Sequence, residues 1–128
     1  MMKLDHYSIR TLELDRVKDF FSDLLGLKPG PRPDFSFNGY WLYGSDPKQA
    51  IVHLIGQKKD QPPIEVGDDT GAYDHMAFQS DNYDDVIGRV KASNWEHWES
   101  TLPGGILRQI FIKGPHNLTV EIVIPTQQ

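Results

Sequence analysis

The first residues of the chain alternate between apolar and polar side chains. In the segment Leu4–Thr11, Tyr7 lies on one face and His6 on the other, which is the period-two pattern of a half-buried strand. In Glu13–Leu25 the apolar residues recur instead at helical spacing, and a glycine that can end a helix follows. The pattern therefore predicts a strand followed by an amphipathic helix.

Three shorter segments complete the first half of the chain. The stretch KPGPRPDFSFNG (28–39) is dense in proline and glycine, so any strand in it is interrupted or lies at a sheet edge. YWLYG (40–44) has the aromatic composition of a strand, and AIVHLIG (50–56) alternates so that His53 faces away from Val52. The predicted order of the first half is β-α-β-β-β.

The middle of the chain separates this half from a similar one. QKKDQPPIEVGDDTGA (57–72) mixes charged residues with proline and glycine, a composition typical of a connection. Beyond it, YDHMAFQS, WEHWES, ILRQIFIKG and LTVEIVIP have strand patterns, and NYDDVIGRVKAS has the pattern of a capped helix. We therefore predict a single domain with module one at 1–56, a linker at 57–72 and module two at 73–128.

The two halves match each other residue by residue at several places. Sliding the chain by 69 positions sets His6 on His75 and superimposes the apolar faces of the strand and the following helix. Near the end of each half the shift is 68 positions, and His53 meets Glu121. An isolated half leaves apolar surface exposed, which a second half can cover. The agreement of a strand, a helix and a last strand in the same order predicts an internal duplication.

Composition and charge narrow the function classes. With 128 residues, 38% hydrophobic and 24% charged, the chain suits one compact soluble unit, and no run approaches the ~20 apolar residues that cross a bilayer. A net charge of −5 without a dense basic cluster argues against a nucleic-acid partner. The lack of cysteine excludes disulfides and thiolate ligands, and the N-terminus has no secretion signal, so a cytoplasmic location is expected.

At His6, His53, His75 and Glu121 the chain resembles the vicinal oxygen chelate superfamily, which includes glyoxalase I, methylmalonyl-CoA epimerase, fosfomycin-resistance proteins, type I extradiol dioxygenases and bleomycin-binding proteins. The resemblance covers essentially the whole chain. It implies an α+β fold in which two βαβββ modules pair into a curved mixed sheet or partial barrel around a cavity. It also implies metal ligands on the first and last strand of each module, which are the places of these four residues, and a homodimer.

The four residues form a donor set without sulfur. Imidazole nitrogens and a carboxylate oxygen suit one divalent ion, which can be Fe, Mn, Co, Ni or Zn. Any one of these residues alone is more commonly a hydrogen-bonded or exposed side chain, but the repeat selects them as a set. Glu121 in the apolar segment LTVEIVIP must face solvent, a partner or a metal. The set is therefore predicted to be a metal site.

The role of His53 decides between two reaction classes. If His53 coordinates, an octahedral ion with four protein ligands keeps two openings for the vicinal oxygens of a substrate, which suits proton transfer in an isomerase or lyase. If it does not, two histidines and a carboxylate resemble the facial triad of non-haem Fe(II) oxygenases, and His53 is a nearby acid or base in an extradiol dioxygenase. In both cases His53 and Glu121 are the predicted catalytic residues.

Other residues are candidates for contact with a small-molecule substrate. Tyr40 and Trp41 belong to an aromatic strand that can line a pocket, and Arg108 on a strand of the second half can neutralise a carboxylate or phosphate. Strand aromatics more commonly pack in a core, however, and a strand arginine is more commonly solvated. The alternative function is a metal-free protein of the bleomycin-resistance type that binds a drug-like or aromatic molecule between its aromatic strands.

Overall fold

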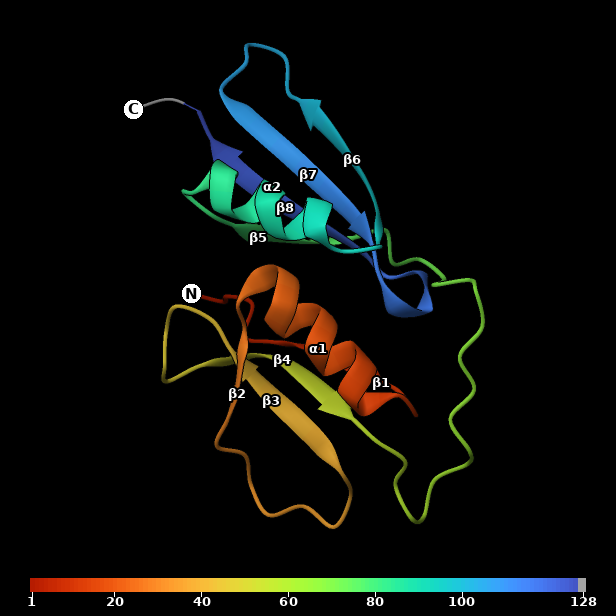
Figure 1. Cartoon of the computed structure of the whole chain (residues 1–128). Coiled ribbons are helices and arrows are strands. Elements are labelled where there is room, and N and C mark those ends of the chain that lie inside the picture. Colours follow the sequence, from red (N-terminus) through yellow and green to blue (C-terminus); the bar gives the residue numbers. More distant parts are fainter. Residues whose placement is uncertain (127–128) are drawn as a thin grey trace. The chain divides into compact units, whose positions relative to one another are not determined.

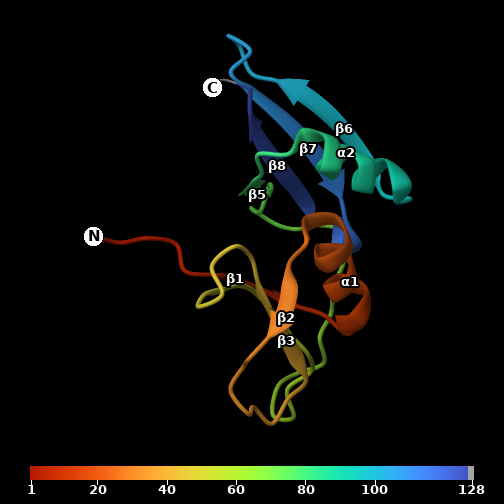
Figure 2. The same cartoon turned by 60° about the vertical axis from the view of Figure 1, so that its left-hand side comes forward.

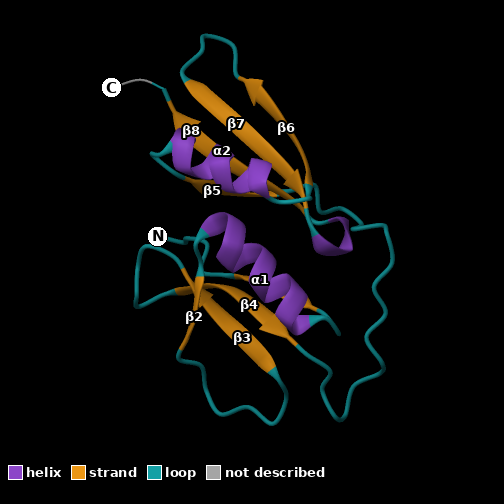
Figure 3. Cartoon of the chain, in the orientation of Figure 1, coloured by secondary structure: helices purple, strands orange, loops and turns teal. Residues whose placement is uncertain are grey.

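The computed structural model describes residues 1–126 and divides into two compact units, Met1–Val66 and a second that starts at Gly67. In its described part each unit holds one four-stranded sheet and one α-helix (Figures 1 and 3). The division falls inside the segment 57–72, where charged residues, proline and glycine are mixed. Each unit can therefore be described by itself.

The first unit has the element order β-α-β-β-β. Its elements are β1 (Tyr7–Arg10), α1 (Leu14–Leu25), β2 (Lys28–Gly30), β3 (Gly39–Tyr43) and β4 (Ala50–Ile55). The strands lie in the order β1-β4-β3-β2, with β1 parallel to β4 and the other neighbours antiparallel. Before β3 begins at its last residue, Gly39, the proline-rich stretch thus contains one short strand, β2, which lies at the sheet edge as its composition predicts.

The second unit repeats this order. Its elements are β5 (Met76–Gln79), α2 (Tyr83–Ala92), β6 (Glu96–Thr101), β7 (Leu107–Lys113), a short 3₁₀ helix (Pro115–Asn117) and β8 (Thr119–Pro125). The strands lie in the order β5-β8-β7-β6, and again the first and last strands of the unit are parallel neighbours (Figure 2). The topology of the two sheets is therefore the same.

Each sheet buries one face against the helix of its own unit. In β4 the residues alternate between buried and half-buried, with Val52 and Leu54 almost fully buried and His53 on the other face. The matching side of α1 presents Val17 and Phe21, both buried, at helical spacing. In the second unit the corresponding core residues are Val86, Val90, Ile110, Ile112, Val120 and Ile122. His53 therefore lies on the face of its sheet that α1 does not cover.

Local sequence signals set the helix ends. Gly26 ends α1 in the left-handed conformation, at a φ of 70°, which glycine adopts without steric cost. Asn82 caps α2, because its side-chain oxygen accepts a hydrogen bond of 3.0 Å from the backbone N–H of Asp85. Both helices therefore begin or end where the sequence predicts.

The predicted α+β fold of two βαβββ modules is confirmed. One detail differs from the expected strands: β1 begins at Tyr7 and β5 at Met76, so His6 and His75 stand immediately before their strands. In the described part of the chain no helix has the length and apolar character needed to cross a membrane.

Candidate metal site

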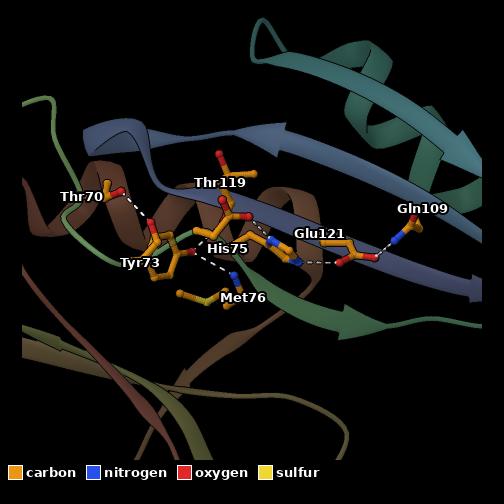
Figure 4. A network of polar contacts seen from close by, with 8 residues as sticks. Thr70, Tyr73, His75, Met76, Gln109, Thr119 and Glu121 are labelled. Carbon is orange, nitrogen blue, oxygen red and sulfur yellow. Dashed lines mark hydrogen bonds and ion pairs between the residues drawn. The ribbon is translucent and has the colours of Figure 1, made fainter.

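In each unit, the face of the sheet that lies away from the unit's own helix is called here the helix-free face. In the second unit His75 and Glu121 meet on this face. Strand β5 runs parallel to β8 with Ala77 beside Glu121, and His75 precedes Ala77 by two residues, so all three share this face. The Nε2 atom of His75 lies 2.9 Å from Oε1 of Glu121 (Figure 4). Two residues far apart in the sequence thus form a polar pair.

Glu121 is buried, with 4% of its surface exposed. Its second carboxylate oxygen, Oε2, accepts a hydrogen bond of 2.8 Å from Nε2 of Gln109 on β7 (Figure 4). Burial of a carboxylate is costly unless a cation or several donors compensate its charge. The residues around Glu121 therefore favour a positive partner close to Oε1.

A second carboxylate orients the imidazole of His75. Oδ2 of Asp74 lies 2.7 Å from Nδ1 of His75, so a proton on Nδ1 directs the Nε2 atom toward Glu121. The hydrogen bond to Asp74 and the charge of Glu121 raise the pKa of His75, while desolvation acts in the opposite direction. When its imidazole is protonated, His75 therefore forms an ion pair with Glu121 through Nε2 and Oε1.

The backbone before β5 is also held in place. The hydroxyl of Tyr73 donates to the backbone carbonyl of Thr119 at 2.6 Å and accepts from the backbone N–H of Met76 at 3.1 Å (Figure 4). These two bonds tie the segment around His75 to β8. The position of the imidazole is therefore fixed by its neighbours on both sides although it precedes the strand.

In the first unit the equivalent pair is His6 and His53. The two imidazole rings are stacked, with centroids 3.8 Å apart and planes 10° apart, and Trp41 stacks on the other side of His53 at 4.1 Å. Asp5 Oδ2 lies 2.6 Å from Nδ1 of His6, which repeats the relation of Asp74 to His75. The duplication thus includes the carboxylate that precedes each histidine.

The surroundings of His53 differ from those of Glu121. Nε2 of His53 lies 3.1 Å from the backbone carbonyl of Ala50, and burial together with His6 lowers the pKa of His53. A metal ion binds an imidazole nitrogen in the plane of its ring, and two stacked rings with nearly parallel planes cannot both direct a lone pair at one ion. One of the two rings must turn before His6 and His53 can share a metal.

In each unit, an aromatic residue on the neighbouring antiparallel strand pairs with the candidate ligand on the last strand. Trp41 on β3 pairs with His53, and Phe111 on β7 pairs with Glu121. Phe111 contacts the ring of His75 edge to face at 5.6 Å and stacks on Trp98 of β6 at 5.5 Å. Both helix-free faces therefore combine polar donors with flat apolar side chains, as small-molecule sites commonly do.

The other two residues predicted to contact substrate lie on the opposite faces of their sheets. Tyr40 pairs with the buried Leu54, and its hydroxyl donates to Oδ1 of Asp15 in α1 at 2.5 Å. The guanidinium of Arg108 lies 3.5 Å from the ring centroid of Tyr83 at the start of α2. Each side chain joins its sheet to its helix, and a contact with substrate stays a prediction for both.

A cavity of about 400 Å³ lies at the end of the helix-free face in the first unit. Its wall includes Arg10 and Ile55, which are paired neighbours on β1 and β4, together with Lys58, Glu65 and other polar and apolar residues of the following segment. Ile55 follows His53 by two residues on the same face of β4. The cavity thus offers two cations, one carboxylate and apolar surface next to the strand that carries His53.

The pair in the second unit fits a divalent metal ion. Two adjacent ligands of an octahedral ion, with bonds of about 2.1 Å, lie about 2.9 Å apart, and the ion-paired atoms His75 Nε2 and Glu121 Oε1 have the same separation. Among residues 1–126 no group of three or more potential ligands is already assembled. Each unit taken by itself supplies two of the four predicted ligands.

Several residues around the site were not expected from the sequence. Gln109 contacts Glu121, and Ser100 contacts Gln109, through cross-strand register, which a strand pattern does not reveal. Asp5 and Asp74 had a visible signal, because the repeat places the same dipeptide, Asp-His, at the start of both modules. The repeat could therefore have identified two of these four residues.

Comparison with known proteins agrees with this architecture. No family model matches the chain. Lactoylglutathione lyase from Salmonella typhimurium is 23% identical over an alignment of 128 positions, and the match covers 95% of this chain and 92% of that protein. Lactoylglutathione lyase from Escherichia coli O157:H7 is 24% identical over an alignment of 131 positions, with the same coverage.

The structure is similar to that of the fosfomycin resistance protein FosX from Listeria monocytogenes. The TM-score is 0.67 at 17% identity, and the match covers 100% of this chain and 94% of that chain. A glyoxalase, bleomycin resistance protein and dioxygenase domain from Frankia sp. EAN1pec matches with a TM-score of 0.69 at 15% identity. The chain thus has the duplicated βαβββ fold of these glyoxalase-like structures and is similar in sequence to lactoylglutathione lyases over nearly its full length.

Proposed function

We propose that the protein is a metal-dependent enzyme whose substrate binds one divalent ion through two adjacent oxygen atoms. His6, His75 and Glu121 would hold the ion, and His53 would stand beside them as a fourth ligand or as an acid or base. Because these residues come from both units, the units would combine within one chain or across a homodimer to complete the site. The ion would be Fe, Mn, Co, Ni or Zn, since all donors are nitrogen or oxygen.

The buried carboxylate of Glu121 is the observation that carries this proposal. It is 4% exposed, and its described hydrogen-bond and ion-pair partners are Gln109 and His75. A carboxylate in this position needs a positive charge, which a divalent ion held by Nε2 of His75 would supply. A protein that only binds an apolar drug has no need for such a group, so the metal-free alternative is not favoured.

When bound, a divalent ion would polarise a carbonyl oxygen of the substrate and so acidify the adjacent carbon. His53 can then take up the proton, because its lowered pKa keeps the imidazole neutral near pH 7. Trp41 stacks on the far side of that ring and holds it in place. Arg10 in the neighbouring cavity can bind an anionic group of the substrate.

The names of the sequence relatives favour proton-transfer chemistry over ring cleavage. Both relatives described above are lactoylglutathione lyases, and a lyase or isomerase needs a proton acceptor such as a neutral histidine. The dioxygenase alternative requires an Fe(II) ion with three protein ligands and three open positions. The stacking of His53 on His6 favours this alternative, because it leaves three protein ligands for the ion.

Two assays on the metal-loaded protein separate these reactions. Metal-dependent exchange of the proton adjacent to the carbonyl of an α-hydroxyketone in deuterium oxide, followed by NMR, would support a lyase or isomerase. Uptake of dioxygen with catechols by the Fe(II)-loaded protein would support a dioxygenase. A protein that binds none of the five metals would contradict both. Loss of exchange in a His53→Ala variant that still binds metal would assign the proton transfer to His53.

A further inference from the structure

We propose that Gln109 is a positioning residue that holds one oxygen of the Glu121 carboxylate and leaves the other for the metal, and that Ser100 sets the orientation of Gln109. This inference rests on the proposed metal site and adds two residues to it. Neither Gln109 nor Ser100 would touch the ion. Both would act through Glu121.

The hydrogen bonds form a chain across three neighbouring strands. Oγ of Ser100 on β6 donates to Oε1 of Gln109 on β7 at 2.7 Å, and Nε2 of Gln109 donates to Oε2 of Glu121 on β8 at 2.8 Å. The other carboxylate oxygen, Oε1, lies 2.9 Å from Nε2 of His75. The two oxygens of Glu121 thus have different partners.

The direction of the Gln109 amide follows from chemistry. An ionised carboxylate accepts hydrogen bonds and cannot donate, so the NH₂ group of Gln109 must face Glu121. The amide oxygen then faces β6, where the hydroxyl of Ser100 is free to rotate and donate to it. If the amide flipped, its oxygen would oppose the carboxylate oxygen, so Ser100 stabilises the one orientation that supports Glu121.

The register explains why these two residues can meet. Ser100 is the direct partner of Gln109 in the β6–β7 ladder, and Gln109 precedes by two residues Phe111, the direct partner of Glu121. Gln109 therefore lies diagonally across from Glu121 on the same helix-free face, a spacing that a long side chain can bridge. Arg108, the adjacent residue, points to the helix side instead.

The first unit has no counterpart of this arrangement. Gly39 pairs with Ile55, two residues after His53, just as Gln109 pairs with Val123, two residues after Glu121. A Cβ added at Gly39 would lie 2.3 Å from the backbone carbonyl oxygen of Leu54, so a side chain is excluded there. His53 instead donates its Nε2 hydrogen bond to the backbone carbonyl of Ala50. Of the equivalent residues His53 and Glu121, Glu121 is the one that another side chain holds by a hydrogen bond. A carboxylate has two chemically equivalent oxygens, and this hydrogen bond makes them different.

Cobalt binding by the full-length protein tests this role. Gln109→Leu removes the donor to Oε2 at nearly constant volume, and Ser100→Ala removes only an exposed hydroxyl that fixes the amide. Gln79→Leu on β5 is the matched control, since Gln79 is exposed and pairs with Val123 on the same sheet. Titration with Co²⁺ gives the affinity, and the visible absorption spectrum of the bound Co²⁺ reports its ligand geometry independently of any activity.

We expect Gln109→Leu to bind Co²⁺ about 10- to 100-fold more weakly and with altered absorption bands, as loss of a hydrogen bond to a metal ligand generally causes. Ser100→Ala should change the spectrum in the same direction and by less, and Gln79→Leu should match the wild type. Wild-type affinity and spectrum in both Gln109→Leu and Ser100→Ala would overturn the positioning role and leave the metal site standing. A wild-type protein that binds no Co²⁺ would overturn both. Circular dichroism of the metal-free variants checks their folding.

Discussion

Nε2 of His75 and Oε1 of Glu121 lie 2.9 Å apart across the parallel strands β5 and β8. Parallel pairing of the first and last strand of a module brings these two positions together on one face. The first unit does the same with His6 and His53, whose rings are stacked. The fold thus builds one polar pair for each module, and the proposed site consists of the two pairs together.

The metal-free protein should lose stability with rising pH through His75. Its folded-state pKa is raised above the ordinary 6.5, chiefly by the hydrogen bond to Asp74. The stabilisation is complete below pH 6.5 and disappears as the pH rises through the raised folded pKa. The free energy of unfolding of wild type relative to a His75→Gln variant, measured with denaturant after chelation, should therefore fall over this window. A difference that is independent of pH would contradict the ion pair.

Metal content should survive the removal of His53. The stacked rings of His6 and His53 cannot both direct a nitrogen at one ion, so His53→Ala should keep the metal and lose turnover. Elemental analysis gives the first quantity and an exchange or oxygen-uptake assay the second. Loss of the ion in this variant would instead show that the His53 ring turns and serves as a fourth ligand.

Tyr40 and Trp41 are adjacent in sequence and lie on opposite faces of β3, so their substitutions should differ. Tyr40→Phe removes the hydrogen bond to Asp15 and should lower the free energy of unfolding by at most about 1 kcal/mol. Trp41→Ala removes the ring that stacks on His53 and should lower kcat/KM. A raised KM in Tyr40→Phe would support the substrate contact predicted from the sequence.

Complementation between inactive variants tests the proposed homodimer. If His6 of one chain works with Glu121 of another, a mixed dimer of His6→Ala and Glu121→Ala chains contains one intact site and one doubly defective site. We expect metal binding and activity to return when the two variants are refolded together. Each variant refolded alone is the control. No recovery in a sample shown to contain mixed dimers would place the whole site within one chain.

Strand alternation and helical spacing were sufficient to predict the two modules and the faces of His53 and Glu121. Both patterns depend only on residues close together in the sequence, and each pattern occurs in both halves of the duplicated chain. These patterns could not predict which residues of β3 correspond to which residues of β7. A constant shift of 68 positions sets Trp41 on Gln109, whereas the ladders make Trp41 equivalent to Phe111. The connection before β4 is longer than that before β8, and β3 has an irregularity at Leu42 and Tyr43.

The partners of Glu121 were hidden from the sequence for a related reason. Ser100 and Gln109 are close to Glu121 only through the register of two antiparallel strand pairs. Register depends on turn geometry and on packing of the buried face, neither of which a pattern of single residues contains. The same uncertainty left Tyr40 and Arg108 as candidates for substrate contact, although the structure places both beside their helices.

Stoichiometric metal binding by the wild-type chain and its loss in Glu121→Ala is the most direct test of the proposed site. The protein would be purified without chelator, analysed for metal content, and titrated with Fe(II), Mn, Co, Ni and Zn. Glu99→Ala is the control, because Glu99 contacts Arg108 and Tyr83 away from the site. We predict one ion per site in wild type and Glu99→Ala and none in Glu121→Ala. A wild-type protein that holds and gains no stoichiometric ion would contradict the account.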